Sequence, residues 1–184
     1  MFRLYYLYLK LAALFLRALT KLQWRIAASP DSIQSIPSRE PGRMIKAHFY
    51  QSSNLSPREP CRLLINFHGS GFILPLHGSD DSFCRHISQQ TNCSVLDVQY
   101  RLAPEHPFPA ALNDVEDAVE WVLKQPERFA PGTLAISGFS AGGNLALVAC
   151  SHLFASGTFR ASLVFYPSVE YSPNPETMVA PEAG

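Results

Sequence analysis

The chain has 184 residues, of which 47% are hydrophobic and 16% charged, so it can form a folded domain and is not a disordered segment. Fifteen Lys and Arg residues balance fifteen Asp and Glu residues. This zero formal charge gives no reason to expect a nucleic-acid partner.

The first 29 residues contain no acidic residue, and the spacing of their basic residues predicts an amphipathic helix over 1–28. The intervals of 7, 7, 4 and 4 residues place the basic side chains on one stripe of a helix. The longest uncharged stretches, 4–9 and 11–16, are too short to span a bilayer, which takes ~20 apolar residues. The basic residues are Arg3, Lys10, Arg17, Lys21 and Arg25.

Three interpretations of segment 1–28 stay open. It could lie in a membrane surface with its apolar face in the lipid and its cations toward the headgroups. It could pack on the body of the protein, over a substrate pocket. A mitochondrial presequence is the third, although the segment has little serine. We expect a cytoplasmic or membrane-associated protein, and the sequence leaves its oligomeric state open.

The rest of the chain reads as a linker, a partial domain and a tail. Residues 29–42 are rich in Pro and Ser and are expected to form a linker. Residues 43–170 are the domain, and the Pro-rich residues 171–184 are expected to be mobile. Continuous apolar strands alternate with helices, which predicts an α/β fold with a mostly parallel sheet covered by helices on both faces. The expected strands are 43–50, 63–67, 94–100, 133–137 and 161–166, and the expected helices are 80–91, 107–125 and 141–155.

The four cysteines have neither C-x-x-C spacing nor a His/Cys cluster, so buried thiols are expected and no metal or cofactor is implied. They are Cys61, Cys84, Cys93 and Cys150.

The segment 138–142, Gly-Phe-Ser-Ala-Gly, matches the G-x-S-x-G pattern. An apolar strand runs directly into it and a helix runs directly out, which is the setting of a nucleophile elbow. A sharp turn at Ser140 needs small neighbours, and Gly138, Ala141 and Gly142 are small. The hydroxyl of Ser140 would then stand at a helix N-terminus, where negative charge is favoured. Ser140 is the candidate nucleophile.

A second glycine-rich segment, His68-Gly69-Ser70-Gly71-Phe72, directly follows the expected strand 63–67. A tight bend there can point successive N–H groups into a cleft. These donors, together with the N–H of Ala141, would hold the oxyanion that forms when Ser140 attacks a carbonyl.

With these segments and the block 97–114 (DVQYRLAPEHPFPAALND), the sequence resembles the hormone-sensitive-lipase-like branch of the α/β-hydrolases. The resemblance covers about 63–167 and implies hydrolysis of small or lipid esters without a cofactor. It implies Ser70, Gly71 and Ala141 as oxyanion donors, although the family carries HGGG where this chain has Ser70. We expect the charged residues of the block, Arg101, Glu105 and Asp114, to brace a loop.

A serine nucleophile needs a base, and in this fold the order is Ser, then Asp or Glu, then His. The only histidine after Ser140 is His152, twelve residues along one helix and so about 18 Å away. His48, His77, His86 and His106 fit no role in this arrangement, although unrelated folds use other triad orders.

The resemblance places the acid and the base after later strands. We therefore expect a C-terminally truncated, nearly inactive esterase with an unpaired apolar edge at 163–166. The alternatives are a non-catalytic ligand-binding protein, as in the plant gibberellin receptor that resembles this branch, and a fragment that does not fold stably alone.

Overall fold

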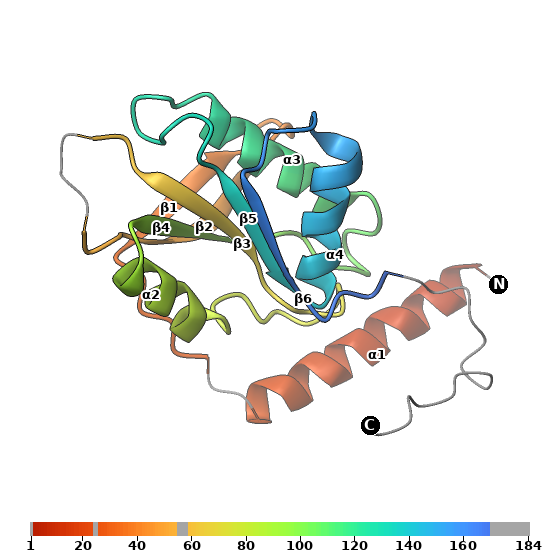
Figure 1. The fold of residues 1–184 in the computed structure, drawn as a ribbon. Helices are drawn as coiled ribbons and strands as arrows, with labels where there is room; N and C mark the ends of the chain where they lie inside the picture. The colour runs from red at the N-terminus through yellow and green to blue at the C-terminus, as the bar shows by residue number, and fades with distance from the viewer. Residues whose placement is uncertain (1, 24–25, 55–58, 170–184) are drawn as a thin grey trace, which may run out of the picture.

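A single six-stranded sheet forms the centre of the computed structural model, which describes residues 2–23, 26–54 and 59–169 (Figure 1). The strand order is β1-β2-β4-β3-β5-β6. The strands β4, β3, β5 and β6 run parallel, whereas β1 and β2 are antiparallel to their neighbours. The bounds are β1 Ser32–Pro37, β2 Met44–Tyr50, β3 Arg62–Phe67, β4 Cys93–Val98, β5 Ala135–Phe139 and β6 Ala161–Phe165.

Helices cover both faces of the sheet, as the apolar strands predicted (Figure 1). Helix α2 (Asp81–Gln90) lies on one face, and α3 (Ala110–Leu123) and α4 (Ala141–Val148) lie on the other. Strand β3 shows how two cores arise: Leu63, Ile65 and Phe67 join the core under α3 and α4, while Leu64 joins the core under α2. This alternation follows from the two-residue period of a strand.

The predicted strands and helices are confirmed with small shifts of their ends, but the linker prediction was wrong. Residues 32–37 of that segment form β1, which pairs with β2, so the sheet begins before residue 43. Only Ile36 of β1 is buried. Because an edge strand can be short and can tolerate Ser and Pro, it lacks the apolar run that marks a central strand. The helix expected over 141–155 also changes form: α4 ends at Val148 and residues Ala149–Leu153 form one π-helical turn.

The four cysteines are free thiols, as expected, with Cys61 and Cys84 buried and the other two partly buried. Strand β6 is an edge of the sheet, as the sequence predicted, because only β5 pairs with it among the described residues. The expected tail 171–184 lies outside the described residues.

Helix α1 (Phe2–Gln23) runs past the ends of β5 and β6 and docks through its polar side (Figure 1). The guanidinium of Arg17 donates to the carbonyls of Ile73 and Ala103 at 2.9 Å and pairs with Glu105. Ala13, on the same side, is buried. The opposite side is apolar and exposed. The helix therefore packs on the body of the protein, at a cavity that Arg17 lines, but it does so through its polar side while its apolar side stays exposed.

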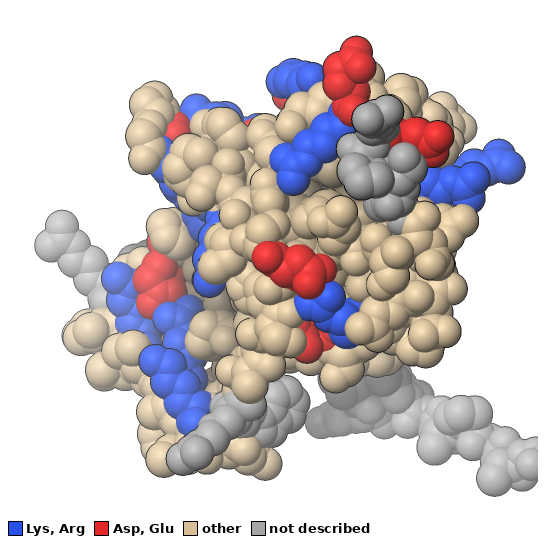
Figure 2. Space-filling view, turned by 90° about the vertical axis from the view of Figure 1, so that its left-hand side faces the viewer, with Lys and Arg blue, Asp and Glu red and all other residues tan. Residues whose placement is uncertain are grey.

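Across the described residues, no helix is both long enough and apolar enough to cross a membrane. The charged side chains on the face shown in Figure 2 lie in small mixed groups of both signs. Ion pairs among the described residues include those of Arg39 with Glu116 and Asp117.

Candidate active site

Ser140 occupies the turn between β5 and α4 in a strained conformation, with φ 49° and ψ −115°. An L-residue rarely adopts this region, because its side chain crowds the backbone. The backbone N–H of Ser140 donates to the carbonyl of Phe165 at 2.9 Å, which ties the turn to β6. The side chain is partly exposed at the start of α4. This is the geometry that the sequence predicted for the turn.

Two glycines make the turn sterically feasible. A Cβ on Gly142 would lie 1.9 Å from the carbonyl oxygen of Phe67, and a Cβ on Gly138 would lie 2.2 Å from that of Gly142. The obstructing atoms belong to the backbone, so no side-chain movement can relieve either clash. The close approach of α4, β5 and the end of β3 is therefore possible only because these positions lack a side chain.

The loop 68–72 lies directly against this turn. An ideal Cβ on Gly69 would lie 3.7 Å from the Cβ of Ser140. The loop bends through left-handed conformations at Gly71 (φ 54°) and Phe72 (φ 61°). The N–H groups of Ser70 and Gly71 donate to none of the described residues, and that of Ala141, the first residue of α4, has no acceptor within the helix. Three N–H groups in the turn and the adjoining loop thus have no acceptor among the described residues.

The hydroxyl of Ser70, which replaces a glycine of the family pattern, is buried and used in the loop's own structure. Its oxygen lies 2.6 Å from that of Tyr100 and accepts from the N–H of Phe72 at 2.8 Å. Because Tyr100 donates its single phenolic proton to the carbonyl of His68 at 2.7 Å, Ser70 must donate to Tyr100. The hydroxyl therefore braces the loop, and the backbone donor of Ser70 stays free.

His68 is a buried part of this scaffold. Its ring stacks on Tyr100 at 4.5 Å, and its Nδ1 lies 3.1 Å from the carbonyl oxygen of Gly69. Burial lowers the pKa of His68 to about 3, despite that backbone contact, so the ring is neutral near pH 7. A neutral Nδ1–H donates to Gly69 and helps to hold the loop.

The hydroxyl of Ser140 forms no hydrogen bond with any described residue. His152 is exposed and contacts the hydroxyl of Ser151, and His86 on α2 is also exposed. His48 and His77 instead meet at Asp97, an arrangement that sequence reasoning missed. Burial lowers the pKa of both histidines to about 4 and raises that of Asp97 to about 7. Their separation along the chain left no local pattern by which to find them.

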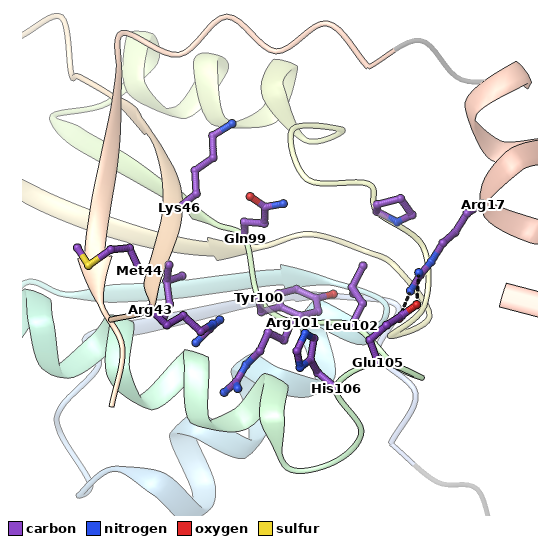
Figure 3. A pocket seen from close by; sticks show the side chains of 12 residues that line it. Arg17, Arg43, Met44, Lys46, Gln99, Tyr100, Arg101, Leu102, Glu105 and His106 are labelled. Carbon is purple, nitrogen blue, oxygen red and sulfur yellow. Dashed lines mark hydrogen bonds and ion pairs between the residues drawn. The ribbon is translucent and has the colours of Figure 1, made fainter. Parts of the chain in front are cut away.

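Two of the three charged residues predicted to brace the loop of the block 97–114, Arg101 and Asp114, contact each other there. The fully buried carboxylate of Asp114 accepts from both Arg43 and Arg101. Glu105 instead holds Arg17 of α1, and this ion pair lowers its pKa. Figure 3 shows Arg17 reaching from α1 to Glu105 at the rim of a cavity of about 380 Å³.

A second cavity, of about 560 Å³, has Gly71 of this loop in its wall. Its walls are mostly apolar and come from the loops 71–72 and 101–112 and from α4. A hydrocarbon group therefore fits beside the candidate site. The apolar lining residues include Phe72, Ala103, Phe108, Leu112, Leu145 and Val148.

Residues 64–183 match the family described as the alpha/beta hydrolase fold. Ethyl acetate hydrolase from Pseudomonas putida is 31% identical over 153 residues, which cover 79% of this chain and 48% of that enzyme. Human hormone-sensitive lipase is 29% identical over 162 residues, covering 84% of this chain and 14% of the lipase. A hyperthermophilic esterase from the archaeon Pyrobaculum calidifontis is 30% identical, with a TM-score of 0.63, and the match covers 86% of this chain and 50% of the esterase. The chain spans about half the length of these relatives or less.

Proposed function

The chain belongs to the α/β-hydrolase family, in the carboxylic-ester-hydrolase branch that resembles hormone-sensitive lipase, and from this we propose that Ser140 is its nucleophile. In the proposed reaction, the Ser140 oxygen attacks an ester carbonyl. The N–H groups of Ser70, Gly71 and Ala141 stabilise the resulting oxyanion, the alcohol leaves, and water releases the acid.

One observation carries this proposal: the strained Ser140 lies beside three N–H groups that have no other described partner. Backbone strain of this kind persists only where the surroundings enforce it, and here two glycines and a bond to β6 do so. A loop that served only to connect β3 with α2 would not need N–H groups without a described acceptor, packed against a strained serine.

The mostly apolar cavity that has Gly71 in its wall favours a substrate with a hydrocarbon part. Together with the family match, this favours an ester of a small or lipid-like acid or alcohol as the substrate. The ethyl acetate hydrolase relative acts, by its name, on a small ester of this class.

We expect the 184-residue chain to turn over esters very slowly, because the Ser140 hydroxyl has no hydrogen-bonded base among the described residues. Loss of triad function typically lowers kcat by ~10⁴–10⁶, while the oxyanion donors and binding retain ~10³–10⁴ over water.

Two measurements on the purified chain and its Ser140→Ala variant test this proposal. After prolonged reaction with a p-nitrophenyl phosphonate, peptide mass spectrometry should place the adduct on Ser140, and the variant should carry none. Turnover of p-nitrophenyl acetate should be slow. Labelling that is equal in both proteins would overturn the nucleophile assignment. Fast turnover that Ser140→Ala abolishes would support the nucleophile but overturn the expected near-inactivity.

The chain is further proposed to lie on anionic membrane surfaces through α1. The exposed side of this helix is a continuous apolar face, with Leu4, Tyr8, Leu11 and Phe15 each more than half exposed. Lys10 and Lys21 flank that face, and the chain has no acidic residue before Asp31. A helix with an apolar face and flanking cations binds at a lipid interface, and anionic headgroups strengthen the binding.

Sedimentation with phosphatidylserine-containing vesicles tests this placement. The chain should sediment with the vesicles, less so at high salt, and a Leu11→Glu, Phe15→Glu double variant should stay in solution. Leu123→Glu, an exposed position on α3, is the matched control and should bind like the unchanged chain. A lipid-binding role for α1 would be contradicted if the double variant bound the vesicles as well as the unchanged chain does. It would also be contradicted if neither high salt nor the double substitution released the chain from the vesicles. Self-association that the double variant abolishes would instead assign the face to a second copy.

A further inference from the structure

A row of buried polar side chains crosses the middle of the sheet on the face that α2 covers. The strand register places His48 on β2 opposite Asp97 on β4, Asp97 beside Asn66 on β3, and Asn66 beside Ser137 on β5. All four residues are buried, three of them completely. Polar groups in such a position must be satisfied by partners, since each unmet group costs folding free energy.

The row is satisfied at one end. The Ser137 hydroxyl donates to the Asn66 side-chain oxygen at 2.8 Å, and the Asn66 amide donates to Oδ1 of Asp97 at 2.9 Å and to Asp80 at 3.0 Å. These bonds fix the rotation of the Asp97 carboxylate. Its second oxygen, Oδ2, is thereby aimed at the two histidines.

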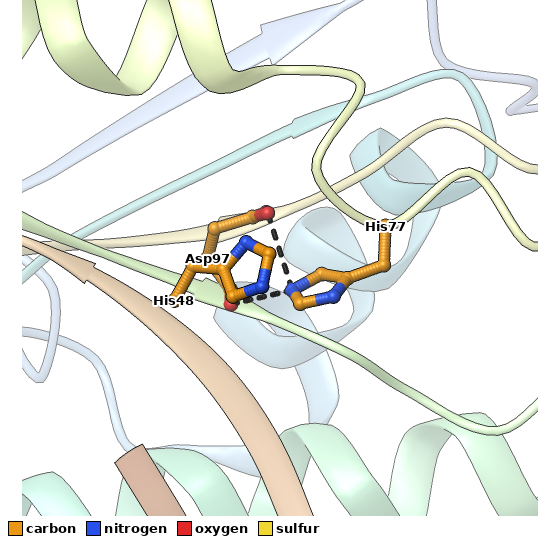
Figure 4. Close-up of side chains that lie close together, drawn as sticks. All are labelled: His48, His77 and Asp97. Atoms are coloured by element: carbon orange, nitrogen blue, oxygen red, sulfur yellow. Dashed lines mark hydrogen bonds and ion pairs between the residues drawn. The ribbon is translucent and has the colours of Figure 1, made fainter. Parts of the chain in front are cut away.

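The other end of the row is unsatisfied. Among the described residues, Oδ2 of Asp97 and Nδ1 of His48 are buried atoms without a hydrogen-bond partner. His77, from the loop before α2, lies next to both: its Nε2 is 3.3 Å from Oδ2 of Asp97, and its ring centroid is 4.1 Å from that of His48 (Figure 4). One candidate donor atom from each residue lies within 4.8 Å of the others.

We propose that His48, His77 and Asp97 bind one zinc-like divalent transition-metal ion. Two imidazoles and a carboxylate are a donor set that Zn²⁺ accepts. Bonds of ~2.0–2.1 Å in a tetrahedron place neighbouring donors roughly 3.4 Å apart, close to the 3.3 Å between His77 and Asp97. The cation would neutralise a carboxylate that lies wholly inside the protein.

The site has an entry route and a structural role. A surface depression of about 480 Å³ includes both His48 and His77 in its wall, so water can supply the remaining ligand. Metal binding would replace the present contact of His77 Nε2 with the Asp97 carbonyl at 3.0 Å. It would tie the segment after the oxyanion loop to β2 and β4, because His77 belongs to that segment. Lys21 and Lys46 line the same depression and weaken the binding of a cation.

Isothermal titration of the tag-free, chelator-treated chain with ZnCl₂ tests the proposal. One Zn²⁺ should bind per chain, Mg²⁺ should not compete, and Co²⁺ should give the visible absorption of a tetrahedral N/O site. His48→Gln and His77→Gln should each weaken binding at least tenfold. Lys46→Met, which removes a neighbouring cation and no ligand, should tighten it. His86→Gln is the matched control and should bind like the unchanged chain.

The metal site would be overturned by no saturable Zn²⁺ binding to a chain that unfolds cooperatively, or by binding that His86→Gln weakens as much as His77→Gln does. Because Asp97→Asn removes a buried group and can unfold the chain, the two histidine variants carry the test. Zn²⁺ should also raise the midpoint of thermal unfolding for the unchanged chain and not for His77→Gln. A rise of equal size in both would likewise contradict the proposal.

Discussion

The turn at 138–142 and the loop at 68–72 lie against each other, but different forces hold them in place. In the turn, backbone meets backbone, and the glycines leave no room for a single added carbon. In the loop, the bend is held by a chain of hydrogen bonds through Phe72, Ser70, Tyr100 and His68. No residue larger than glycine therefore fits at positions 138 and 142 of the turn without moving the backbone. In the loop, by contrast, the side chain of Ser70 or Tyr100 can be replaced at a limited cost in folding free energy. Substitutions in the two regions should differ accordingly.

Gly142→Ala should have the largest effect. The new Cβ would lie 1.9 Å from the carbonyl oxygen of Phe67, so the backbone of α4 or β3 must move. Overpacking against backbone typically destabilises by ~1–3 kcal/mol, and we expect at least about 3 kcal/mol here. Urea denaturation measures this. Ala146→Gly, in the same helix, is the control without a clash: it should cost about 1 kcal/mol in helix propensity and about 1 kcal/mol for the lost buried methyl group. If Gly142→Ala and Ala146→Gly lowered the free energy of unfolding equally, the predicted clash at position 142 would be contradicted.

Tyr100→Phe should come next. It removes the hydroxyl that donates to His68 and accepts from Ser70, and it leaves two buried groups without a partner. The expected loss is about 1–3 kcal/mol. Amide hydrogen exchange in 68–72 should quicken while that of 138–142 stays slow. The control is Tyr5→Phe, on the exposed side of α1. Uniform quickening of both segments would show that loop and turn are one cooperative unit.

His68 makes the loop sensitive to acid. Burial lowers its pKa in the folded chain from an ordinary 6.5 to about 3. The unfolded chain therefore takes up a proton first, and folding stability falls as the pH drops below 6.5 toward 3, by about 1.4 kcal/mol per pH unit for one such group. Compared with the unchanged chain, His68→Phe should show a slope smaller by about this amount. Because only the difference in slope is used, the other buried histidines cancel. Parallel stability curves would contradict a neutral His68.

The two regions also differ in what sequence could predict about them. The turn is encoded locally, since five consecutive residues between an apolar strand and a helix specify it, and its position was predicted correctly. The same holds for the apolar strands of the sheet. The row His48–Asp97–Asn66–Ser137 was not predictable, because its members are adjacent only through strand register. Strand β1 escaped prediction because only Ile36 of its residues is buried.

Helix α1 shows a further limit of sequence reasoning. The spacing of the basic residues predicted that they form a stripe on the helix. It did not predict that Arg17 turns inward to Glu105 and to the carbonyls of Ile73 and Ala103. A cation on an amphipathic helix is expected to face solvent or lipid headgroups. The partners that draw it inward lie in a loop far along the chain, and no periodicity reports them.

Ser70→Gly should have the smallest effect on folding stability. Together with Ser70→Ala, it separates the contribution of the Ser70 hydroxyl to the loop from that of the restricted Ser70 backbone. The change restores the glycine of the family pattern and removes the bonds to Phe72 and Tyr100. We expect a loss of about 1 kcal/mol, from the hydrogen bonds and from the greater freedom of glycine in the unfolded chain. Ser70→Ala keeps the restricted backbone and isolates the hydrogen-bond term. If the hydroxyl braces the loop, both variants should quicken amide exchange at Phe72. If only Ser70→Gly does so, the restricted backbone of Ser70, and not its hydroxyl, holds the loop in place.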